Sequence, residues 1–409
     1  MTDALACQVI GAGPAGMGFI LALCNRIAQG DSEQSASARA LLDSLLIFEA
    51  SPRPGGRMGR YRVNANTDAH DVVKGILDGN PFTAIRDAYL GLSETRASLI
   101  PLPTIERLMV QPLATAMLEH LGPRLRCEEP VSRVVITAEG FESYRPDNSL
   151  LARSETMLFC CGGRETLLPA LSGLAAHCET SADFILRDNL EGLAEENSPI
   201  IIIGASHSAF SCAWRLLHDP LFADFASGRE IIMLQRHEKI KLRCTPAFAE
   251  QHNIEYDAQQ DLCPVNGNVF HNGGLRKDAK MLYLRIRDGE EKRVGLVSIN
   301  EVSDRKDLLD AAGLILQATG FRPNLPPIER NGELLEIGEP GPQGELSVDK
   351  KPIPGLYGLG LGMNIPLPAN AGGEKSFRGS INGFQSYPLV VAPLIIDQLL
   401  ANNVRRCSK

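Results

Sequence analysis

Two strand–turn–helix patterns in distant parts of the chain constrain the fold more than any other feature of this sequence. The first is the segment 11–16, Gly-Ala-Gly-Pro-Ala-Gly, which fits G-x-G-x-x-G, follows the apolar run 7–10 and precedes apolar residues at helical spacing. The second is the segment 204–209, Gly-Ala-Ser-His-Ser-Ala, which follows four isoleucines at 200–203. Each pattern is typical of a nucleotide-binding turn between a parallel strand and a helix. We therefore predict an α/β chain with two Rossmann-like dinucleotide-binding domains.

Each glycine of the first turn has its own role. Gly11 permits the sharp turn, Gly13 lets a pyrophosphate approach the backbone, and Gly16 allows the helix to pack closely on the strand. The free N–H groups and the positive dipole end of the following helix favour phosphate groups. We therefore predict that a dinucleotide contacts these three glycines together with Pro14 and Ala15, which stand between them.

An acidic residue at the end of the next strand supports this interpretation. Glu49 follows the apolar segment 45–48, where a carboxylate is expected to bind the adenosine ribose. The distance from the first turn exceeds the usual spacing of about 20 residues. The polar segment 30–38 accounts for the excess as an insertion after the first helix. The alternative is an ordinary βαβ unit with a surface glutamate.

The second turn differs from the first at its middle position. Gly204 keeps the sharp turn and Ala209 still allows close packing, but Ser206 replaces the second glycine. A serine narrows the approach of a pyrophosphate, although its hydroxyl can donate a hydrogen bond to phosphate. Such a site suits a cosubstrate that binds and leaves better than a permanently bound group. His207 and Ser208 are further candidates to contact that cosubstrate, and His207 is equally consistent with a plain loop residue.

Basic residues after the next strand indicate which cosubstrate binds there. The apolar segment 231–234 is followed by Gln235 and Arg236, with Lys239 and Lys241 close behind. An acid at this position is typical of NAD sites, whereas an arginine pairs with the 2′-phosphate of NADP. We therefore predict that Arg236 selects NADPH. The alternative is that these residues form a solvated basic loop.

The segment that follows Glu49, Ser-Pro-Arg-Pro-Gly-Gly-Arg-Met, resembles the Gly-Gly segment of two-dinucleotide-binding flavoproteins. With the two turns, Ala-Thr-Gly-Phe at 318–321 and Asn-Ala-Asn-Thr at 64–67, the chain resembles flavin-containing and N-hydroxylating monooxygenases. The resemblance implies FAD at the first site and NADPH at the second. Beyond the residues already named, it implies cofactor contacts at Ala50, Gly56, Arg57, Met58, Val131, Gly162 and Gly320. Arg57 is equally consistent with a solvated loop arginine.

In the monooxygenases that the chain resembles, a loop asparagine lies beside the reactive carbon of the flavin. Asn66 matches this asparagine and Asn64 is the second candidate, so the resemblance implies a catalytic role here. The alternative is a simple turn, because asparagine favours turns by itself. Two departures leave the subfamily and the substrate open: the second turn lacks its middle glycine, and the Phe-x-Gly-x-x-x-His signature is absent.

The order of these motifs predicts a discontinuous FAD-binding domain, residues 1–165 and 320–409, with an NAD(P)H-binding domain inserted at 166–319. The resemblance implies an FAD-dependent, NADPH-using monooxygenase that oxygenates a nitrogen or sulfur of a small molecule with molecular oxygen, through a flavin C4a-hydroperoxide. Two alternatives remain: an NAD(P)H:acceptor reductase without oxygen insertion, and a non-catalytic FAD-binding redox sensor. A flavin disulfide reductase would need a paired-cysteine motif, and none of the ten cysteines forms Cys-x-x-Cys.

Composition narrows the partners and the location. A net charge of −8 argues against nucleic acid as the main partner. No apolar run approaches the roughly 18 residues of a membrane span, and the N-terminus lacks a basic leader. Scattered cysteines and few histidines favour reduced thiols, a cytoplasmic protein and no metal site. The sequence is compatible with a homo-oligomer but does not specify one.

Overall fold

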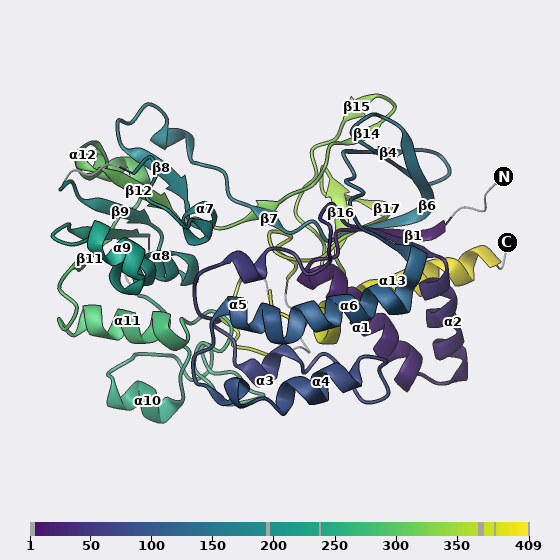
Figure 1. Cartoon of the computed structure of the whole chain (residues 1–409), viewed down its shortest axis with the longest axis horizontal. Coiled ribbons are helices and arrows are strands. Elements are labelled where there is room, and N and C mark those ends of the chain that lie inside the picture. Colours follow the sequence, from purple (N-terminus) through teal and green to yellow (C-terminus); the bar gives the residue numbers. More distant parts are fainter. Residues whose placement is uncertain (1–4, 194–196, 237–238, 367–371, 380–381, 408–409) are drawn as a thin grey trace.

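The protein, seen here as a computed structural model, consists of two lobes that lie side by side (Figure 1). The structure describes residues 5–193, 197–236, 239–366, 372–379 and 382–407. Each lobe is built around its own sheet, with helices packed against it. The predicted α/β fold with two Rossmann-like units is therefore confirmed.

The centre of the first lobe is a parallel sheet. Its strands run in the spatial order β3, β2, β1, β6 and β17, and each neighbouring pair is parallel. The strands are β1 (Leu5–Ile10), β2 (Leu45–Phe48), β3 (Leu125–Arg126), β6 (Leu150–Phe159) and β17 (Lys351–Gly358). Val9 and Leu158 are fully buried, as expected for a parallel sheet that is covered on both faces.

Shorter strands extend this sheet from the long strand β6. The first half of β6 pairs with β5 in antiparallel fashion, and its second half pairs with β1 and β17. The added strands are β4 (Arg133–Ile136), β5 (Phe141–Tyr144), β14 (Ile328–Arg330), β15 (Glu333–Leu334) and β16 (Glu345–Val348).

Helices cover the first sheet. Helix α1 begins at Pro14, since proline suits the first helical position. The polar segment after α1 forms helix α2, whose N-cap Asp31 accepts a hydrogen bond from Gln34 N. The α-helices of this lobe are α1 (Pro14–Gln29), α2 (Ser32–Asp43), α3 (Ala69–Val72), α4 (Thr83–Leu90), α5 (Leu102–Ile105), α6 (Gln111–Leu121) and α13 (Ala392–Cys407). Short turns of 3₁₀ or π helix are η1 (Met58–Arg60), η2 (Ser93–Arg96), η3 (Glu106–Val110), η4 (Gly122–Arg124) and η8 (Tyr387–Val391).

The second lobe contains a five-stranded parallel sheet in the order β11, β10, β9, β12, β8. The four isoleucines of β9 are all buried in its centre. The strands are β8 (His177–Thr180), β9 (Ile200–Ile203), β10 (Ile231–Gln235), β11 (Val294–Ser298) and β12 (Leu314–Gln317). The helices are α7 (Ser181–Leu186), α8 (His207–His218), α9 (Pro220–Phe225), α10 (Pro246–Gln251), α11 (Lys277–Arg287) and α12 (Lys306–Ala311), with 3₁₀ turns η5 (Pro169–Leu171) and η6 (Val302–Arg305).

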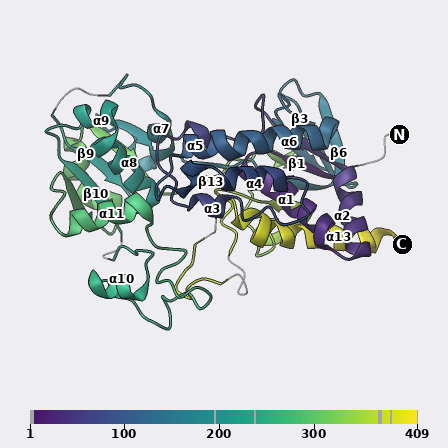
Figure 2. The same ribbon diagram turned by 60° about the horizontal axis from the view of Figure 1, so that its bottom comes forward.

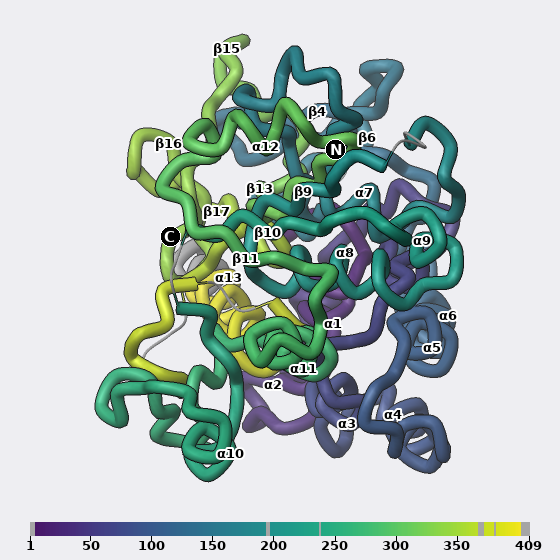
Figure 3. The backbone as a smooth tube through the Cα atoms, turned by 90° about the vertical axis from the view of Figure 1, so that its left-hand side faces the viewer, coloured from purple at the N-terminus to yellow at the C-terminus, as the bar shows by residue number. Residues whose placement is uncertain are grey.

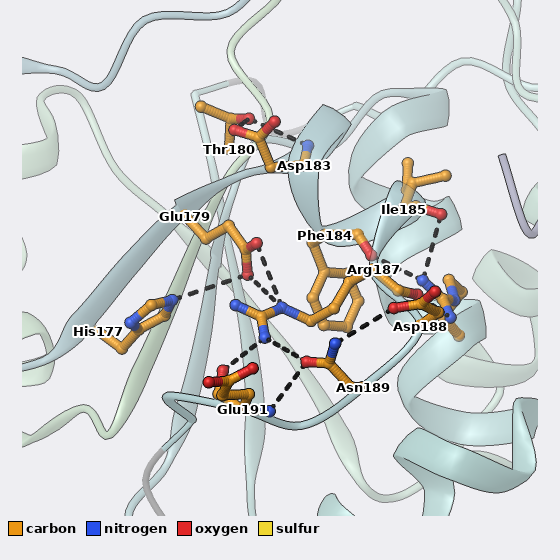
Figure 4. A network of polar contacts seen from close by, with 11 residues as sticks. His177, Glu179, Thr180, Asp183, Phe184, Ile185, Arg187, Asp188, Asn189 and Glu191 are labelled. Carbon is orange, nitrogen blue, oxygen red and sulfur yellow. Dashed lines mark hydrogen bonds and ion pairs between the residues drawn. The ribbon is translucent and has the colours of Figure 1, made fainter. Parts of the chain in front are cut away.

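A fully buried arginine ties α8 to α7. The guanidinium of Arg215 donates hydrogen bonds to the carbonyl oxygens of Phe184 (2.6 Å), Ile185 (3.2 Å) and Arg187 (3.0 Å), at the carboxyl end of α7. It also pairs with Asp219 at 2.7 Å. Figure 4 shows Phe184 and Ile185 beside the polar network that holds Arg187, the arginine that precedes Arg215 in the chain. The arginine thus satisfies carbonyl groups that the end of a helix leaves without partners.

Two strands connect the lobes. The chain leaves the first lobe through β7 (Gly163–Arg164) and returns through β13 (Arg322–Pro323), which pair antiparallel to each other (Figure 1). We propose that the domain boundaries lie beside these strands, near residues 165 and 320. Within the part of the chain that the structure describes, none of the helices has the length and hydropathy of a membrane span.

Candidate active site

The backbone of the first turn leaves no space for side chains at two of its glycines. Gly11 has φ +100°, and a Cβ atom there would lie 2.6 Å from the carbonyl oxygen of Cys160. A Cβ atom on Gly16 would lie 2.2 Å from the carbonyl oxygen of Gly11. These contacts bring β1, α1 and the end of β6 together at the carboxyl edge of the sheet, where dinucleotides bind in such folds.

The Gly-Gly segment closes over the first turn. A Cβ atom on Gly56 would lie 3.1 Å from Pro14 Cδ, and one on Gly13 would lie 3.7 Å from the Cα atom of Gly56. Gly55 N donates a hydrogen bond of 2.9 Å to Ala12 O, which holds the two loops together. The N-cap Gly13 has no side chain to cap α1, so the N–H groups of its first turn are left for an anion.

Glu49 lies where a ribose-binding acid was predicted. Its side chain is buried, and it accepts hydrogen bonds of 2.8 Å from Ala12 N and Ser51 N. A carboxylate offers about four lone-pair sites, so further sites remain for ribose hydroxyl groups. These bonds also orient the carboxylate toward the first turn. Glu49 and the first turn therefore fit the adenosine half of FAD.

The other residues predicted to contact FAD differ in exposure. Ala50, Gly56 and Arg57 are exposed, Met58 and Val131 are half-buried, and Gly162 adopts a positive φ of 72° with open space around it. Arg57 lines a separate pocket of about 440 Å³ that also contains Arg60, Glu179 and Asp183. Although the adjacent Gly56 packs on the glycine turn, the side chain of Arg57 forms no hydrogen bond or ion pair with that turn among the described residues.

Two residues near the first turn were missed by sequence reasoning. Gly360, in the segment after β17, has φ +118°, and a Cβ atom there would lie 2.9 Å from Ala15 Cβ. The repeated glycines of Gly358-Leu-Gly-Leu-Gly362 were a signal that this segment approaches another backbone. Glu106 packs against Gly59, its Oε2 atom has no hydrogen-bond partner among the described residues, and burial raises the pKa of its carboxyl group. No local sequence signal marks Glu106.

The second turn repeats the geometry of the first. Gly204 has φ +129°, and a Cβ atom there would lie 2.4 Å from the carbonyl oxygen of Ala318 at the end of β12. Ser206 is the N-cap of α8, yet its side chain is exposed and makes no capping hydrogen bond. The hydroxyl of Ser206 is therefore available to a phosphate. Ala209, at the third glycine position, is fully buried, so this turn accommodates a methyl group where the first does not.

His207 is occupied by a contact within the protein. Its Nε2 atom accepts a hydrogen bond of 3.2 Å from Arg276 N. Burial, together with the nearby Arg276, lowers the pKa of His207 to about 4, so the ring is neutral at pH 7. Ser208 is half-buried in the first turn of α8. The imidazole therefore positions the chain around Arg276, in addition to any contact with a cosubstrate.

The remaining residues predicted for the cosubstrate are exposed. Arg236 directly follows β10 and forms no ion pair with any described residue. Its neighbours at 237–238 lie outside the described residues. Gly320, next to the returning strand β13, has φ +100°; its backbone N–H donates to the Glu165 carboxylate, and among the described residues nothing lies within 4 Å of the position that a Cβ atom would occupy. Arg236 is thus free to meet a phosphate group that arrives from solvent.

A pocket of about 660 Å³ lies between the two lobes. The first lobe contributes Asn66, Asp68, Ser98 and Leu99, and the second contributes residues of α8, α11 and the segment 243–248. In Figure 2, α11 of the second lobe lies to the left of α3 of the first lobe, and α10 lies below α11. Figure 3 looks onto the second lobe and shows α10 below α11. The pocket is thus shaped by both lobes.

Of the two predicted catalytic asparagines, Asn66 lines this pocket and Asn64 contacts a residue that lines it. Asn66 is exposed on its wall, and Thr67 Oγ1 donates to Asn66 Oδ1 at 3.4 Å. Asn64 is half-buried, and its Nδ2 atom donates to Asp278 Oδ2 at 3.1 Å. Burial raises the pKa of Asp278, which also lines the pocket. A carboxyl group, an amide and a set of cations therefore meet at one place.

No protein-family model matches this chain. A curated relative, the CMP-5′-(3-aminopropyl)phosphonate hydroxylase of Streptomyces rubellomurinus, is 25% identical across 97% of this chain and 97% of its own length. Among solved structures, ornithine hydroxylase from Pseudomonas aeruginosa matches 98% of this chain and 100% of its own, with a TM-score of 0.57 at 15% identity. The complex of OTEMO with FAD and NADP matches 99% of this chain and 86% of its own, with a TM-score of 0.57 at 13% identity. The resemblance to two-dinucleotide-binding flavoprotein monooxygenases is thereby confirmed, and the chain has their fold.

Proposed function

We propose that the protein is an FAD-dependent, NADPH-using monooxygenase that oxygenates the nitrogen of a small amine. The observation that carries this proposal is the pair of glycine turns, each closed against a neighbouring strand in the same way, with a two-lobe pocket lined by Asn66 beside them. The relative and one structural neighbour are named as hydroxylases, one of an aminopropyl compound and the other of ornithine. Both names describe amine-bearing substrates, which favours nitrogen over sulfur.

The residues present fit both cofactors. Gly11, Gly13 and Gly16 would hold the FAD pyrophosphate, and Glu49 would hold its ribose. Ser206 and the first turn of α8 would hold the pyrophosphate of NADPH, with Arg236 on the 2′-phosphate. When bound, the flavin supplies hydride acceptance and, once reduced, the activation of oxygen.

The pocket residues would prepare the amine. An ammonium group is no nucleophile, so the substrate must lose a proton before it attacks. Asp278 has a raised pKa because it is buried, and this makes it a better proton acceptor than an exposed carboxylate. Asn64 fixes the carboxylate through the 3.1 Å hydrogen bond, while Asn66 offers an amide donor to the pocket.

Cysteine chemistry disfavours a flavin disulfide reductase. None of the cysteines in the described part of the chain forms a disulfide. Burial raises the pKa of the Cys161 thiol to about 12, and burial also raises the pKa of Cys160 well above its ordinary value. Since the thiolate is the reactive form, neither residue is suited to exchange. An acceptor reductase and a redox sensor remain as the competing functions.

The first experiment asks whether NADPH reduces the flavin. Under anaerobic conditions, NADPH should bleach the FAD of the purified protein, because the second turn and Arg236 are intact. A protein whose flavin keeps its colour would be a sensor, and the proposal would be wrong. If the flavin is bleached, admission of oxygen with an amine substrate should yield hydroxylated amine in step with NADPH consumption. Consumption matched entirely by hydrogen peroxide would instead identify an oxidase or acceptor reductase.

Arg236 should set the preference for NADPH over NADH. In Arg236→Ala we expect the Kd of NADPH to rise by about tenfold or more, because a charge-assisted hydrogen bond to the 2′-phosphate is lost. The Kd of NADH should change little. Lys239→Ala is the matched control, since Lys239 is a nearby cation that pairs with Glu255 at 3.4 Å. Stopped-flow flavin reduction at varied cosubstrate gives both constants, and an equal loss in the two variants would show that only general basicity matters.

The setting of the protein is also proposed. Molecular oxygen and a small molecule are the partners that the chemistry requires. Buried, protonated thiols such as Cys7, whose pKa burial raises to about 12, are consistent with a reducing compartment, and we propose the cytoplasm.

A further inference from the structure

We propose that the pocket between the lobes takes a small zwitterion, with its amine beside Asp278 and a phosphate or phosphonate group among Arg243, Arg276 and Lys280. This inference rests on the proposed function, because it names the substrate class of the same site. It is carried by the charges and contacts of the pocket wall.

The cationic side chains that line the pocket outnumber the carboxylates that line it. Five cationic side chains line it: Arg243, Arg276, Lys277, Lys280 and Arg285. Lys277 pairs with Asp68, and Arg285 lies 3.6 Å from Glu291. The other three cations form no ion pair with any residue in the described ranges. Asp278, the second carboxyl group of the wall, is instead hydrogen-bonded to Asn64.

The guanidinium group of Arg276 is only partly hydrogen-bonded. Its Nη2 atom donates to His271 O at 2.9 Å, but its buried Nε atom has no partner among the described residues. Burial and the nearby Arg243 lower the pKa of Arg276 to about 10. The carboxylate of Glu374 is taken by the backbone N–H groups of Asn272 and Gly273, at 2.8–3.2 Å. Glu374, Asp71 and Asp68 are near enough to favour the charged form of Arg276, yet none of them forms an ion pair with it. A partly buried cation that lacks a direct ion pair favours the binding of an anion.

Lys280 and Arg243 lie next to each other. The ammonium of Lys280 donates to Arg243 O at 3.3 Å and lies 4.5 Å from the centre of the Phe248 ring. Burial lowers the pKa of Lys280, and the nearby Arg243 and Lys277 lower it further. The same positive field, after burial, lowers the pKa of His271 to about 4. Three uncompensated cations exceed what one carboxylate can neutralise, whereas a phosphate or phosphonate carries up to two negative charges and several acceptor oxygens.

The two ends of the pocket differ in sign. Asp278 reaches toward the first lobe, since it bonds Asn64, and Asn66 lies on that same wall. Lys280 reaches the other way, over Phe248 of the segment that carries α10. The anion of a bound zwitterion would therefore lie on the second lobe, and its amine would lie toward the first lobe and the flavin site.

The phosphates of NADPH are the other possible source of the anion. Arg276 N contacts His207 near the second turn, so part of the cluster lies close to the cosubstrate site. However, the pocket also reaches Trp214, eight residues beyond Ser206 and thus about 12 Å further along α8 at 1.5 Å per residue. A Rossmann pyrophosphate remains at the helix N-terminus. The pocket therefore has room for a second ligand.

Binding to the FAD-loaded protein tests this proposal without turnover. Calorimetric titration with 3-aminopropylphosphonate in saturating NADP⁺ should show binding to the wild type. The double variant Arg243→Gln, Lys280→Gln should bind it about tenfold or more weakly, while Lys292→Gln, an exposed residue away from the pocket, should match the wild type. Ornithine, with a carboxylate as its anion, should bind about tenfold more weakly than the phosphonate. FAD content and thermal melting confirm that each variant is folded.

Three results would overturn the proposal. In the wild type, loss of phosphonate binding when NADP⁺ is added would assign the cluster to the cosubstrate. Equal binding of ornithine would assign the pocket to amino acids. A folded double variant that retains full affinity would show that the cations do not bind the anion. Because flavin reduction by NADPH is measured separately, failure of the proposed function and failure of this inference are distinguishable.

Discussion

Gly16→Ala is expected to remove FAD from the protein. The added methyl group would lie 2.2 Å from the carbonyl oxygen of Gly11, which is backbone and cannot swing away. Helix α1 must therefore move off β1, and its free N–H groups leave the position at which they meet the pyrophosphate. We expect FAD content after purification to fall to about a tenth of the wild type or less, as a loss of more than 1.4 kcal/mol in binding requires. The measurement is flavin absorbance per mole of protein.

Gly295→Ala is the matched control for this experiment. Gly295 lies in β11 of the second lobe, and nothing lies within 4 Å of the position that its Cβ atom would occupy. This variant should keep its full FAD content. A Gly16→Ala protein that also keeps one FAD per chain would show that α1 tolerates the shift and that the first turn does not bind the pyrophosphate closely.

Ala209 gives an internal reference for the first prediction. It occupies the position in the second turn that Gly16 occupies in the first, and it is fully buried without displacing α8. The second helix therefore starts further from its strand than the first. This difference agrees with the interpretation of Ser206, because both residues indicate a looser turn for a cosubstrate that leaves.

The local motifs were readable from the sequence because their causes are local. The spacing alone predicted tight turns at Gly11 and Gly204. At each position an added Cβ atom would clash with the backbone at the end of a neighbouring strand. The strand-to-acid pattern located Glu49, whose buried carboxylate accepts two backbone N–H groups. In each case one short segment contains the strand, the turn and the residue.

The features that the sequence did not reveal depend on contacts between distant segments. Gly360 meets Ala15 only because β17 is inserted beside β6. His207 contacts Arg276 because the chain returns to α8 after α10. The sequence predicted a cofactor contact for His207, and the structure shows that His207 also holds the backbone of a pocket residue. Arg276 and Lys280 lie four residues apart at the start of α11, whereas Arg243 comes from a different segment, so helical spacing alone does not bring all three cations together.

The predicted site residues were brought together only in part. Asn66 lines the pocket between the lobes, and Asn64 is linked to that pocket only through its hydrogen bond to Asp278. Arg57 instead faces a smaller pocket with Asp183. A loop arginine has a long side chain whose direction is set by nearby charges, and these charges were not visible in the sequence around Arg57.

Arg215→Met should destabilise the second lobe by about 3–5 kcal/mol, because removing one side of a buried charged network leaves the rest unpaired. The substitution keeps the apolar stem but removes the guanidinium donors to three carbonyl oxygens, those of Phe184, Ile185 and Arg187. It also removes the ion-pair partner of Asp219. Urea unfolding can follow this lobe by itself, because the single tryptophan of the chain, Trp214, lies next to Arg215 on α8.

Arg305→Met is the control for the stability experiment, since Arg305 forms only a surface pair with Asp307 at 2.9 Å, which contributes about 1 kcal/mol or less. The tryptophan transition of Arg215→Met should shift to lower urea, whereas the flavin signal of the first lobe should shift less. The lobes are joined by the crossing strands β7 and β13, by the pocket walls and by contacts such as the 3.2 Å hydrogen bond from Arg62 N to Ile185 O. We expect α7 and α8 to loosen before the FAD site does, because the lost donors lie in the second lobe. Coincident shifts of both signals would mean that the lobes unfold as one unit. If the free energy of unfolding of Arg215→Met lies within about 1 kcal/mol of the wild type, water replaces the lost donors.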